Sequence, residues 1–338
     1  NLLGFYLLKS FGIYVSSYLI LIIFIIPSII FFSKKYQIVI KLIIVSHLPF
    51  IIALLIILIF NKNIESQEKT INFEVFQIFS PINNPNTKKI EKDIINKINN
   101  SNAEYLVFAE NNYPYLISDI NNINILGSIK DNKKVIIGST RLANNKLYNS
   151  FLYLEENNVQ VFDKEILVPF GEFLPFRKYL KFMENITGNI DFIPGKTSRL
   201  ITNEQINILP LICYEIIFNE ILKNTNQNNI DIIINITNDS WFGDKVGPYQ
   251  HFYHSRMRAI ISNKILIRVS NNGISAIIDN DGGIIQSSQL NTKASFSSFL
   301  QLKNYTYFKL MHNIFEIYLI IIILFYFIFI NYKFRYDK

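Results

Sequence analysis

Three long apolar stretches constrain this chain more than any other feature of its sequence. Phe11–Phe32 has no charged residue and would extend about 33 Å as an α-helix. Leu42–Phe60 would extend about 28 Å, and Ile314–Tyr332 is of similar length with one acidic residue, Glu316. These lengths match the hydrocarbon core of a bilayer. The sequence therefore predicts membrane-spanning helices at residues 11–32, 42–60 and 314–332, with a buried core helix as the alternative for each.

Basic residues flank these stretches on one side. Lys34, Lys35 and Lys41 separate the first two, and three more basic residues follow the last one. The positive-inside rule assigns both clusters to the cytoplasm, so residues 61–313 are expected on the opposite side, in a bacterium the periplasm. The chain opens within an apolar region that lacks the basic start and cleavage site of a signal peptide. Residues 1–60 are therefore expected to be the C-terminal part of a larger membrane domain, and residues 314–338 a last helix with a short cytoplasmic tail.

Composition excludes several kinds of site. The chain is 50% hydrophobic and 17% charged, and it has one cysteine, so neither an internal disulfide nor a cysteine-rich metal site is possible. His251 and His254 are three residues apart with no third ligand nearby, and we expect no metal and no cofactor. The net charge of +7 is partly explained by the basic flanks. Without an aromatic-interleaved basic groove, no nucleic-acid partner is expected, and we expect a monomer.

The middle of the chain alternates short β-rich runs with helical ones, and it contains no internal repeat or flexible linker. Several of the β-rich runs are continuously apolar, as in strands covered on both faces. Predicted strands are 71–79, 103–109, 134–140, 149–155, 159–163, 206–212, 230–237, 264–270 and 274–280. Predicted helices are Thr87–Ile98, Glu215–Lys223 and Tyr249–Ser262, and residues 280–283 predict a hairpin turn. Residues 61–313 are therefore predicted to form one layered α/β domain.

Three residues that are useful in catalysis each follow a predicted strand. Glu110 ends one apolar run, Lys164 ends another, and Cys213 stands between a third strand and a helix. Strand C-termini commonly carry the sites of α/β domains. Cys213 would be the nucleophile, Glu110 the general base, and Lys164 a cation that stabilises first the thiolate and then an oxyanion, helped by the backbone N–H of Tyr214.

Each of these residues also has a simpler explanation. A lone Glu or Lys after a strand is usually a solvated loop residue, and a free cysteine is often a buried small hydrophobe. The occurrence of all three residues at the ends of predicted buried strands favours a catalytic site over coincidence.

The surrounding motifs resemble a known superfamily. Val-Pro-Phe-Gly-Glu at 168–172 follows the lysine, Ile-Cys-Tyr-Glu at 212–215 contains the cysteine, and Asn-Asp-Ser-Trp-Phe-Gly begins at Asn238. Together with the order Glu, Lys, Cys, these motifs resemble the nitrilase-type carbon–nitrogen hydrolase superfamily. Within it, the chain is similar to the membrane-embedded apolipoprotein N-acyltransferase family. The likeness covers residues 72–285 and extends to the flanking apolar stretches.

The resemblance implies a nitrilase-like α-β-β-α sandwich flanked by transmembrane helices, and an acyl transfer in two steps. Cys213 would take a fatty acyl chain from a phospholipid as a thioester. The N-terminal amino group of a diacylglyceryl-cysteine apolipoprotein would then collect it, with the lipid bilayer as a further partner, at the inner membrane facing the periplasm. By this resemblance Glu110 would be the general base and Lys164 the residue that stabilises the oxyanion. Cys213 is the nucleophile.

Further residues would support this site. Glu172 would orient Lys164 or balance its charge, and Tyr214 and Glu215 match positions that matter in the family. Glu215 has an alternative role as an acid at a helix N-terminus.

Two aromatic segments would meet the lipid. Trp241 is expected in a pocket wall, with a core aromatic as the alternative. Phe173–Met183 interleaves aromatics, Phe173 and Phe176 among them, with basic residues, a pattern that suits the surface of a bilayer, and a lid packed on the domain is the alternative.

The chain departs from the family at several positions. A tryptophan common in the family near residues 79–89 is absent, Phe108-Ala109 replaces a commoner Trp-Pro, and Phe162 stands where Tyr is frequent. The departure at 79–89 puts one wall of the substrate pocket in question.

Two other functions remain open from the sequence. One is a membrane-tethered amidase that hydrolyses a C–N bond, and the other is a non-catalytic binding module. The apolar flanks favour a lipid substrate over a soluble amide, and the intact set of Glu110, Lys164 and Cys213 disfavours a binding module.

Overall fold

The computed structural model describes residues 2–32, 36–60, 69–79, 86–130, 132–156, 158–184, 190–196, 199–225, 229–302 and 309–336. The chain divides into two compact units, one made of Asn1–Ile64 with Thr306–Lys338 and the other of Glu65–Tyr305.

The first unit contains three helices, which cover the three apolar stretches. They are α1 (Leu2–Phe32), α2 (Tyr36–Phe60) and α7 (Lys309–Tyr336), packed around the rings of Phe11 and Phe50. Among the described residues one segment, Gly4–Phe32, is long and apolar enough to cross a membrane, and two apolar helices, Tyr36–Ile52 and His312–Ile328, are shorter. Only 11% of the most apolar window of Gly4–Phe32 is buried, which favours a lipid-facing helix over a core helix. That all three helices span a membrane stays a prediction.

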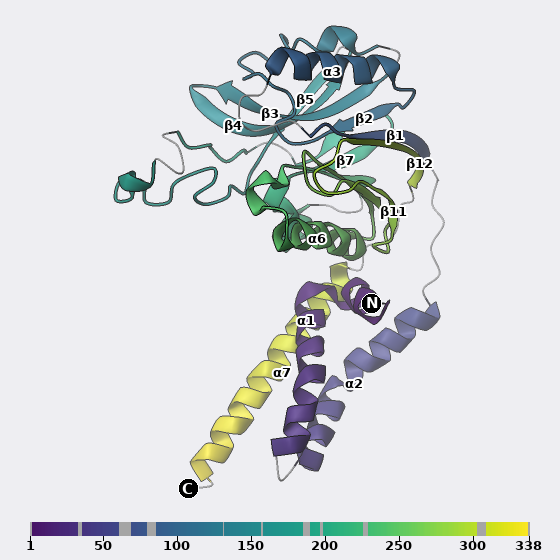
Figure 1. The fold of residues 1–338 in the computed structure, drawn as a ribbon. Helices are drawn as coiled ribbons and strands as arrows, with labels where there is room; N and C mark the ends of the chain where they lie inside the picture. The colour runs from purple at the N-terminus through teal and green to yellow at the C-terminus, as the bar shows by residue number, and fades with distance from the viewer. Residues whose placement is uncertain are drawn as a thin grey trace. The chain divides into compact units, whose positions relative to one another are not determined.

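The second unit is built on two six-stranded sheets (Figure 1). The first sheet has the order β12-β1-β2-β3-β4-β5, and the second has the order β11-β10-β9-β8-β7-β6. The strands of the first sheet are β1 (Lys69–Gln77), β2 (Tyr105–Phe108), β3 (Lys134–Ala143), β4 (Lys146–Glu155), β5 (Asn158–Asp163) and β12 (Ala294–Leu302). Those of the second are β6 (Ile201–Thr202), β7 (Asn207–Ile212), β8 (Ile232–Thr237), β9 (Ile265–Ser270), β10 (Ala276–Ile278) and β11 (Ile284–Ser287).

The central strands of each sheet are parallel, so their C-terminal ends share one edge. In the first sheet β2 pairs in parallel with both β1 and β3, and in the second β8 pairs in parallel with both β7 and β9. The residues that follow β2 therefore lie at this edge of the first sheet, and those that follow β7 and β8 lie at the same edge of the second. α/β domains commonly place their sites at such C-terminal edges.

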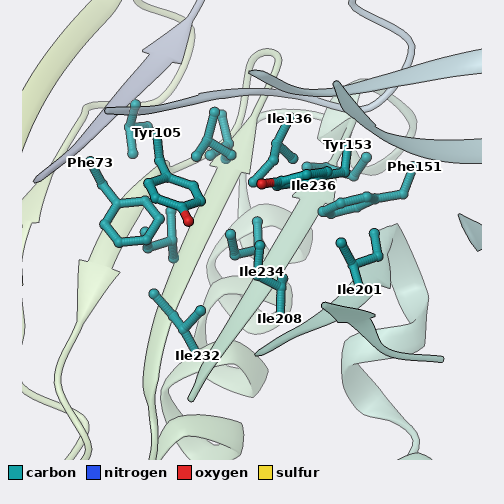
Figure 2. Close-up of a cluster of buried hydrophobic side chains, with 14 of the residues drawn as sticks. Phe73, Tyr105, Ile136, Phe151, Tyr153, Ile201, Ile208, Ile232, Ile234 and Ile236 are labelled. Atoms are coloured by element: carbon teal, nitrogen blue, oxygen red, sulfur yellow. The ribbon is translucent and has the colours of Figure 1, made fainter. Parts of the chain in front are cut away.

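The main hydrophobic core lies between the two sheets. Figure 2 shows Phe73, Tyr105 and Phe151 of the first sheet facing Ile208, Ile232 and Ile234 of the second. All six side chains are fully buried. Because β8 is covered on both faces, its sequence is a nearly unbroken apolar run rather than an alternating one.

Helices cover the outer faces, as Figure 1 shows. α3 (Thr87–Asn100) presents Ile90, Ile94 and Ile98 to a second core on the first sheet. α6 (Val246–Ser262) packs against β9 on the second sheet. The layers are therefore helix, sheet, sheet and helix, which confirms the predicted α-β-β-α sandwich.

The predicted elements are matched with three differences. The helix expected at Glu215–Lys223 is two pieces, the 3₁₀ helix η3 (Cys213–Ile217) and α5 (Asn219–Asn224), because Phe218 between them is extended. β11 and β12 were not expected as strands, although the hairpin predicted at 280–283 joins β10 to β11 with Gly282 at φ 79°. β6 is also new and adds a short antiparallel edge to β7.

Candidate active site

Cys213 lies at a sharp turn between β7 and η3. Its φ is 51°, a left-handed conformation that is uncommon for a residue with a side chain and costs about 1–3 kcal/mol. The thiol belongs to a buried residue, with 7% of Cys213 exposed. Strained backbone of this kind clusters at functional sites, so the turn supports a special role for Cys213.

The structure brings Glu110, Lys164 and Cys213 together. Glu110 follows β2, Lys164 follows β5, and both are buried, with 5% and 1% exposed. Glu110 and Lys164 each interact electrostatically with Cys213 and with one another. Two of the three come from the first sheet and one from the second, so the packing of the sheets sets their spacing.

Glu172 completes the buried cluster beside Lys164. The Nζ atom of Lys164 donates to Glu172 over 2.8 Å, and the other side of the carboxylate accepts from the backbone N–H of Val168, also at 2.8 Å. The geometry matches the predicted pairing of Glu172 with Lys164.

Asn149 of β4 links the two carboxylates and was missed by the sequence analysis. Its Nδ2 donates to Glu110 over 2.7 Å and to Glu172 over 2.8 Å. The heavy use of asparagine along the chain hid this residue, because one asparagine in a strand carries no signal against that background.

The electrostatics of the cluster favour a neutral thiol at rest. Burial, reinforced by the charge of Glu110, raises the pKa of Cys213 to about 12, although Lys164 opposes the shift. Burial also raises the pKa of Glu110 above its ordinary value. Burial alone would lower the pKa of Lys164, but the neighbouring Cys213, Glu110 and Glu172 outweigh it and raise that pKa. Lys164 favours the thiolate, as expected, but burial outweighs it, so the thiol needs a base.

Glu215 is fully buried and ties the turn of Cys213 to the loop after Lys164. Its Oε2 accepts from the backbone N–H of Ile212 at 2.9 Å, and its Oε1 accepts from that of Glu165 at 3.0 Å. Arg199 donates to the same Oε1 over 3.1 Å. Glu215 thus does more than serve the start of a helix, because it also joins two loops of the cluster.

A second buried network lies against the backbone of Cys213. Asp239 accepts from Arg268 at 2.7 Å and lies 2.7 Å from Nδ1 of His251, and Nε2 of His251 lies 3.2 Å from the carbonyl oxygen of Cys213. Burial and then Arg268 lower the pKa of His251, against the opposing effect of Asp239. His251 is therefore part of a polar network, and no group of residues able to hold a metal ion occurs in the described part of the chain.

The aromatic arm, residues Phe173–Met183, is held by Arg177 and exposes several of its aromatic rings. Arg177 donates to Asp191 over 2.9 Å and to Glu184 over 2.8 Å. Phe173 is half-buried, whereas Phe176 is 79% exposed. Tyr179 and Phe182 are exposed to a similar extent. The arm does not pack down as a closed lid, and its exposed rings suit contact with an apolar partner.

The remaining predicted residues lie around the turn. Trp241, in the 3₁₀ helix η5 (Asp239–Phe242), is 77% exposed, so the alternative of a core aromatic is wrong. The ring of Tyr214 lies near those of Phe242 and His251. Most of the region without the expected tryptophan, residues 80–85, lies outside the described residues.

The profile of the carbon–nitrogen hydrolase family matches residues 121–302, more than half of the chain. The chain belongs to the carbon–nitrogen hydrolase family. The matched segment contains Lys164, Glu172 and Cys213, and Glu110 precedes it.

Curated relatives share a common name. A protein of Rickettsia typhi named apolipoprotein N-acyltransferase is 44% identical over 179 residues, which cover 52% of this chain and 35% of the relative. A protein of Wigglesworthia glossinidia brevipalpis with the same name is 37% identical over 209 residues, covering 57% and 40%. The chain thus matches well under half the length of these relatives.

Solved structures agree on the fold. Nit3 of Saccharomyces cerevisiae, a nitrilase-superfamily protein, superposes with a TM-score of 0.53 at 17% identity, covering 71% of this chain and 92% of that one. A CN-hydrolase superfamily protein of Xanthomonas campestris gives 0.53 at 13% identity, covering 69% and 91%. At such identities the likeness concerns the two-sheet architecture alone.

Proposed function

We propose that this chain carries the acyl-transferring site of an apolipoprotein N-acyltransferase. Cys213 takes a fatty acyl chain from a phospholipid as a thioester, and the α-amino group of a diacylglyceryl-cysteine apolipoprotein accepts it. The burial of Glu110, Lys164 and Cys213 in one cluster, where their charges interact, carries this proposal. The shared name of the relatives supports the choice of acyl transfer within the family.

In the first half-reaction, the Glu110 carboxylate removes the proton of the Cys213 thiol as the sulfur attacks the ester carbonyl. The new C–S bond converts the carbonyl oxygen to an oxyanion, which the Lys164 ammonium and the Tyr214 N–H stabilise. The C–O bond of the ester then breaks. Protonated Glu110 returns its proton to the departing oxygen, which leaves as the hydroxyl of a lysophospholipid.

In the second half-reaction, the neutral α-amino group of the apolipoprotein attacks the thioester carbonyl. Glu110 accepts a proton from the attacking nitrogen, and the same two donors stabilise the second oxyanion. The C–S bond breaks, and the sulfur recovers its proton from Glu110. The products are an amide and the original thiol, so Glu110 ends as it began.

The apolar surfaces of the chain support a lipid as the acyl donor. The rings of Phe176 and Trp241 are more than three-quarters exposed, an unusual cost for a protein that meets only water. Gly4–Phe32 is long and apolar enough to cross a bilayer. We place the enzyme in the bacterial inner membrane as a multi-pass monomer, with the catalytic domain on the periplasmic side, and we assign Phe173, Phe176 and Trp241 to the acyl chain.

The proposal is tested by the intact mass of the protein after incubation with phosphatidylethanolamine in detergent. We expect a mass increase of one fatty acyl group in the wild type, none in Cys213→Ala, and removal of the adduct by hydroxylamine, which cleaves thioesters.

Two results would overturn the proposal. Turnover of a small amide without an acyl adduct would assign the site to a membrane-tethered amidase. No reaction with either substrate would leave a binding module that has kept the fold.

Glu172→Gln is expected to slow acyl-enzyme formation roughly 10²-fold with the fold intact, because Lys164 loses the anion that orients it toward the oxyanion. Single-turnover acylation followed by intact mass measures the rate, and circular dichroism checks the fold. Glu165→Gln is the matched control, because this nearby carboxylate pairs with Arg199 rather than Lys164. A Glu172→Gln rate close to that of the wild type would remove Glu172 from the mechanism.

A further inference from the structure

Asp239, His251 and Arg268 form a network of charged and polar side chains in the interior of the domain. Asp239 and Arg268 have no exposed area, and His251 is 4% exposed. Taking two charges out of water costs several kcal/mol per ion, which their mutual attraction repays only when the geometry is excellent. Well-packed apolar side chains would stabilise the fold as well, so such a network points to a role beyond stability.

The network reaches the backbone carbonyl oxygen of Cys213 from two sides. Nε2 of His251 lies 3.2 Å from this oxygen, and Nδ2 of Asn235 donates to it over 3.3 Å. In the imidazolium form Nδ1 donates to Asp239, 2.7 Å away, while Nε2 donates to the carbonyl of Cys213. Asn235 is itself held by Arg268, which donates to its Oδ1 over 2.8 Å. Two side-chain donors therefore converge on one carbonyl group.

The geometry of the peptide bond gives this contact a consequence at the reacting atoms. The carbonyl of Cys213 and the N–H of Tyr214 belong to the same planar trans peptide group and point in opposite directions. Holding the carbonyl toward His251 therefore holds the N–H of Tyr214 away from it. Because Cys213 has a left-handed φ of 51°, this peptide lies at the sharp turn where β7 ends and η3 begins.

We propose that His251, held by Asp239 and Arg268, is a positioning residue that aims the N–H of Tyr214 at the oxyanion formed during acyl transfer. The inference rests on the proposed function, because it assigns a part in the two tetrahedral intermediates of that reaction. His251 touches neither the substrate nor the sulfur atom in this role. It acts through the peptide group that follows the nucleophile.

Two substitutions separate the two contacts of the ring. The amide nitrogen of glutamine can replace Nε2 of histidine, and that of asparagine can replace Nδ1. His251→Gln thus keeps a donor for the carbonyl of Cys213, whereas His251→Asn keeps only the contact with Asp239. We expect acyl-enzyme formation from phosphatidylethanolamine to be roughly 100-fold slower in His251→Asn, and to stay within about threefold of the wild type in His251→Gln.

Alkylation of Cys213 by iodoacetamide is the control reaction. It consumes the same thiol but displaces iodide from a saturated carbon, so no oxyanion develops. We expect both variants to alkylate at the rate of the wild type. Loss of alkylation together with acylation would show that the network only maintains the turn, and equal acylation in His251→Asn and the wild type would also overturn the inference.

The same assay separates this inference from the proposed function. A wild-type protein that alkylates but forms no acyl adduct rejects acyl transfer, and the positioning role falls with it. If His251→Asn does not fold, Asn235→Asp replaces it, because aspartate keeps an oxygen for Arg268 but has no donor for the carbonyls of Cys213 and Leu211. Slower acylation with unchanged alkylation is expected there too, and unchanged acylation overturns the inference.

Discussion

Glu110→Gln is expected to slow acylation of Cys213 by roughly 10³-fold at neutral pH, a larger effect than that of Glu172→Gln. The reason is the protonation state of the nucleophile. Burial raises the pKa of Cys213 to about 12, so almost no thiolate exists at pH 7 unless a base removes the proton during attack. Glutamine keeps the size of the side chain and removes the base.

The pH dependence of this variant tests the explanation. Without a base, the rate follows the thiolate fraction, which rises about tenfold per pH unit below the thiol pKa. Single-turnover acylation between pH 7 and pH 9 should therefore climb steeply in Glu110→Gln and remain nearly flat in the wild type. Glu104→Gln is the control, because this carboxylate pairs with Lys134 outside the cluster. A Glu110→Gln rate near that of the wild type at pH 7 would contradict the role of Glu110.

Arg268→Met is expected to lower the free energy of unfolding by roughly 3–5 kcal/mol, because it leaves Asp239 charged and uncompensated in the interior. Asp239 has no exposed area, and Arg268 donates to its Oδ2 over 2.7 Å. Thermal unfolding in detergent, followed by circular dichroism, measures the change. Arg256→Met is the control: Arg256 is only partly buried and donates to the carbonyl of Gly282, so a much smaller loss is expected.

The pH dependence of stability has a definite sign. Burial alone would raise the pKa of Asp239, but Arg268 and His251 hold it below its ordinary value. The wild type therefore has the full contribution of this carboxylate above the unfolded pKa of about 3.9 and loses it as the pH falls below that value. In Arg268→Met the folded pKa rises above the unfolded one, so the penalty is largest at neutral pH and shrinks on acidification. If the difference in unfolding free energy between the wild type and Arg268→Met grew from pH 7 to pH 5, this account would be contradicted.

Much of the architecture follows from local sequence, and the exceptions are instructive. β8 is predictable because an apolar run of strand length is the mark of a strand buried on both faces. β12 is not, because it pairs with β1 from more than 200 positions away and its two phenylalanines, Phe296 and Phe299, lie on opposite faces, which weakens the apolar alternation of its sequence. Phe218 interrupts an otherwise plausible helix in a way that only the tertiary fold dictates.

Some residues of the candidate site are predictable from the sequence and others are not. Glu110, Lys164 and Cys213 are predictable, because each follows a buried strand and chemistry restricts which residues could serve there. Asn149 and His251 are not, because their roles depend on which atoms they meet across the fold. No spacing in the sequence encodes a shared amide donor or a contact with one carbonyl oxygen.

The division of the cluster between two sheets has a consequence for the making of the protein. Glu110 and Lys164 are carried by the first sheet and Cys213 by the second, with the sheet-to-sheet core between them. A nascent chain in which only one sheet has formed holds a cysteine with no base and no cation beside it. Under the proposed function, reactivity toward acyl groups would therefore be withheld until both sheets have docked.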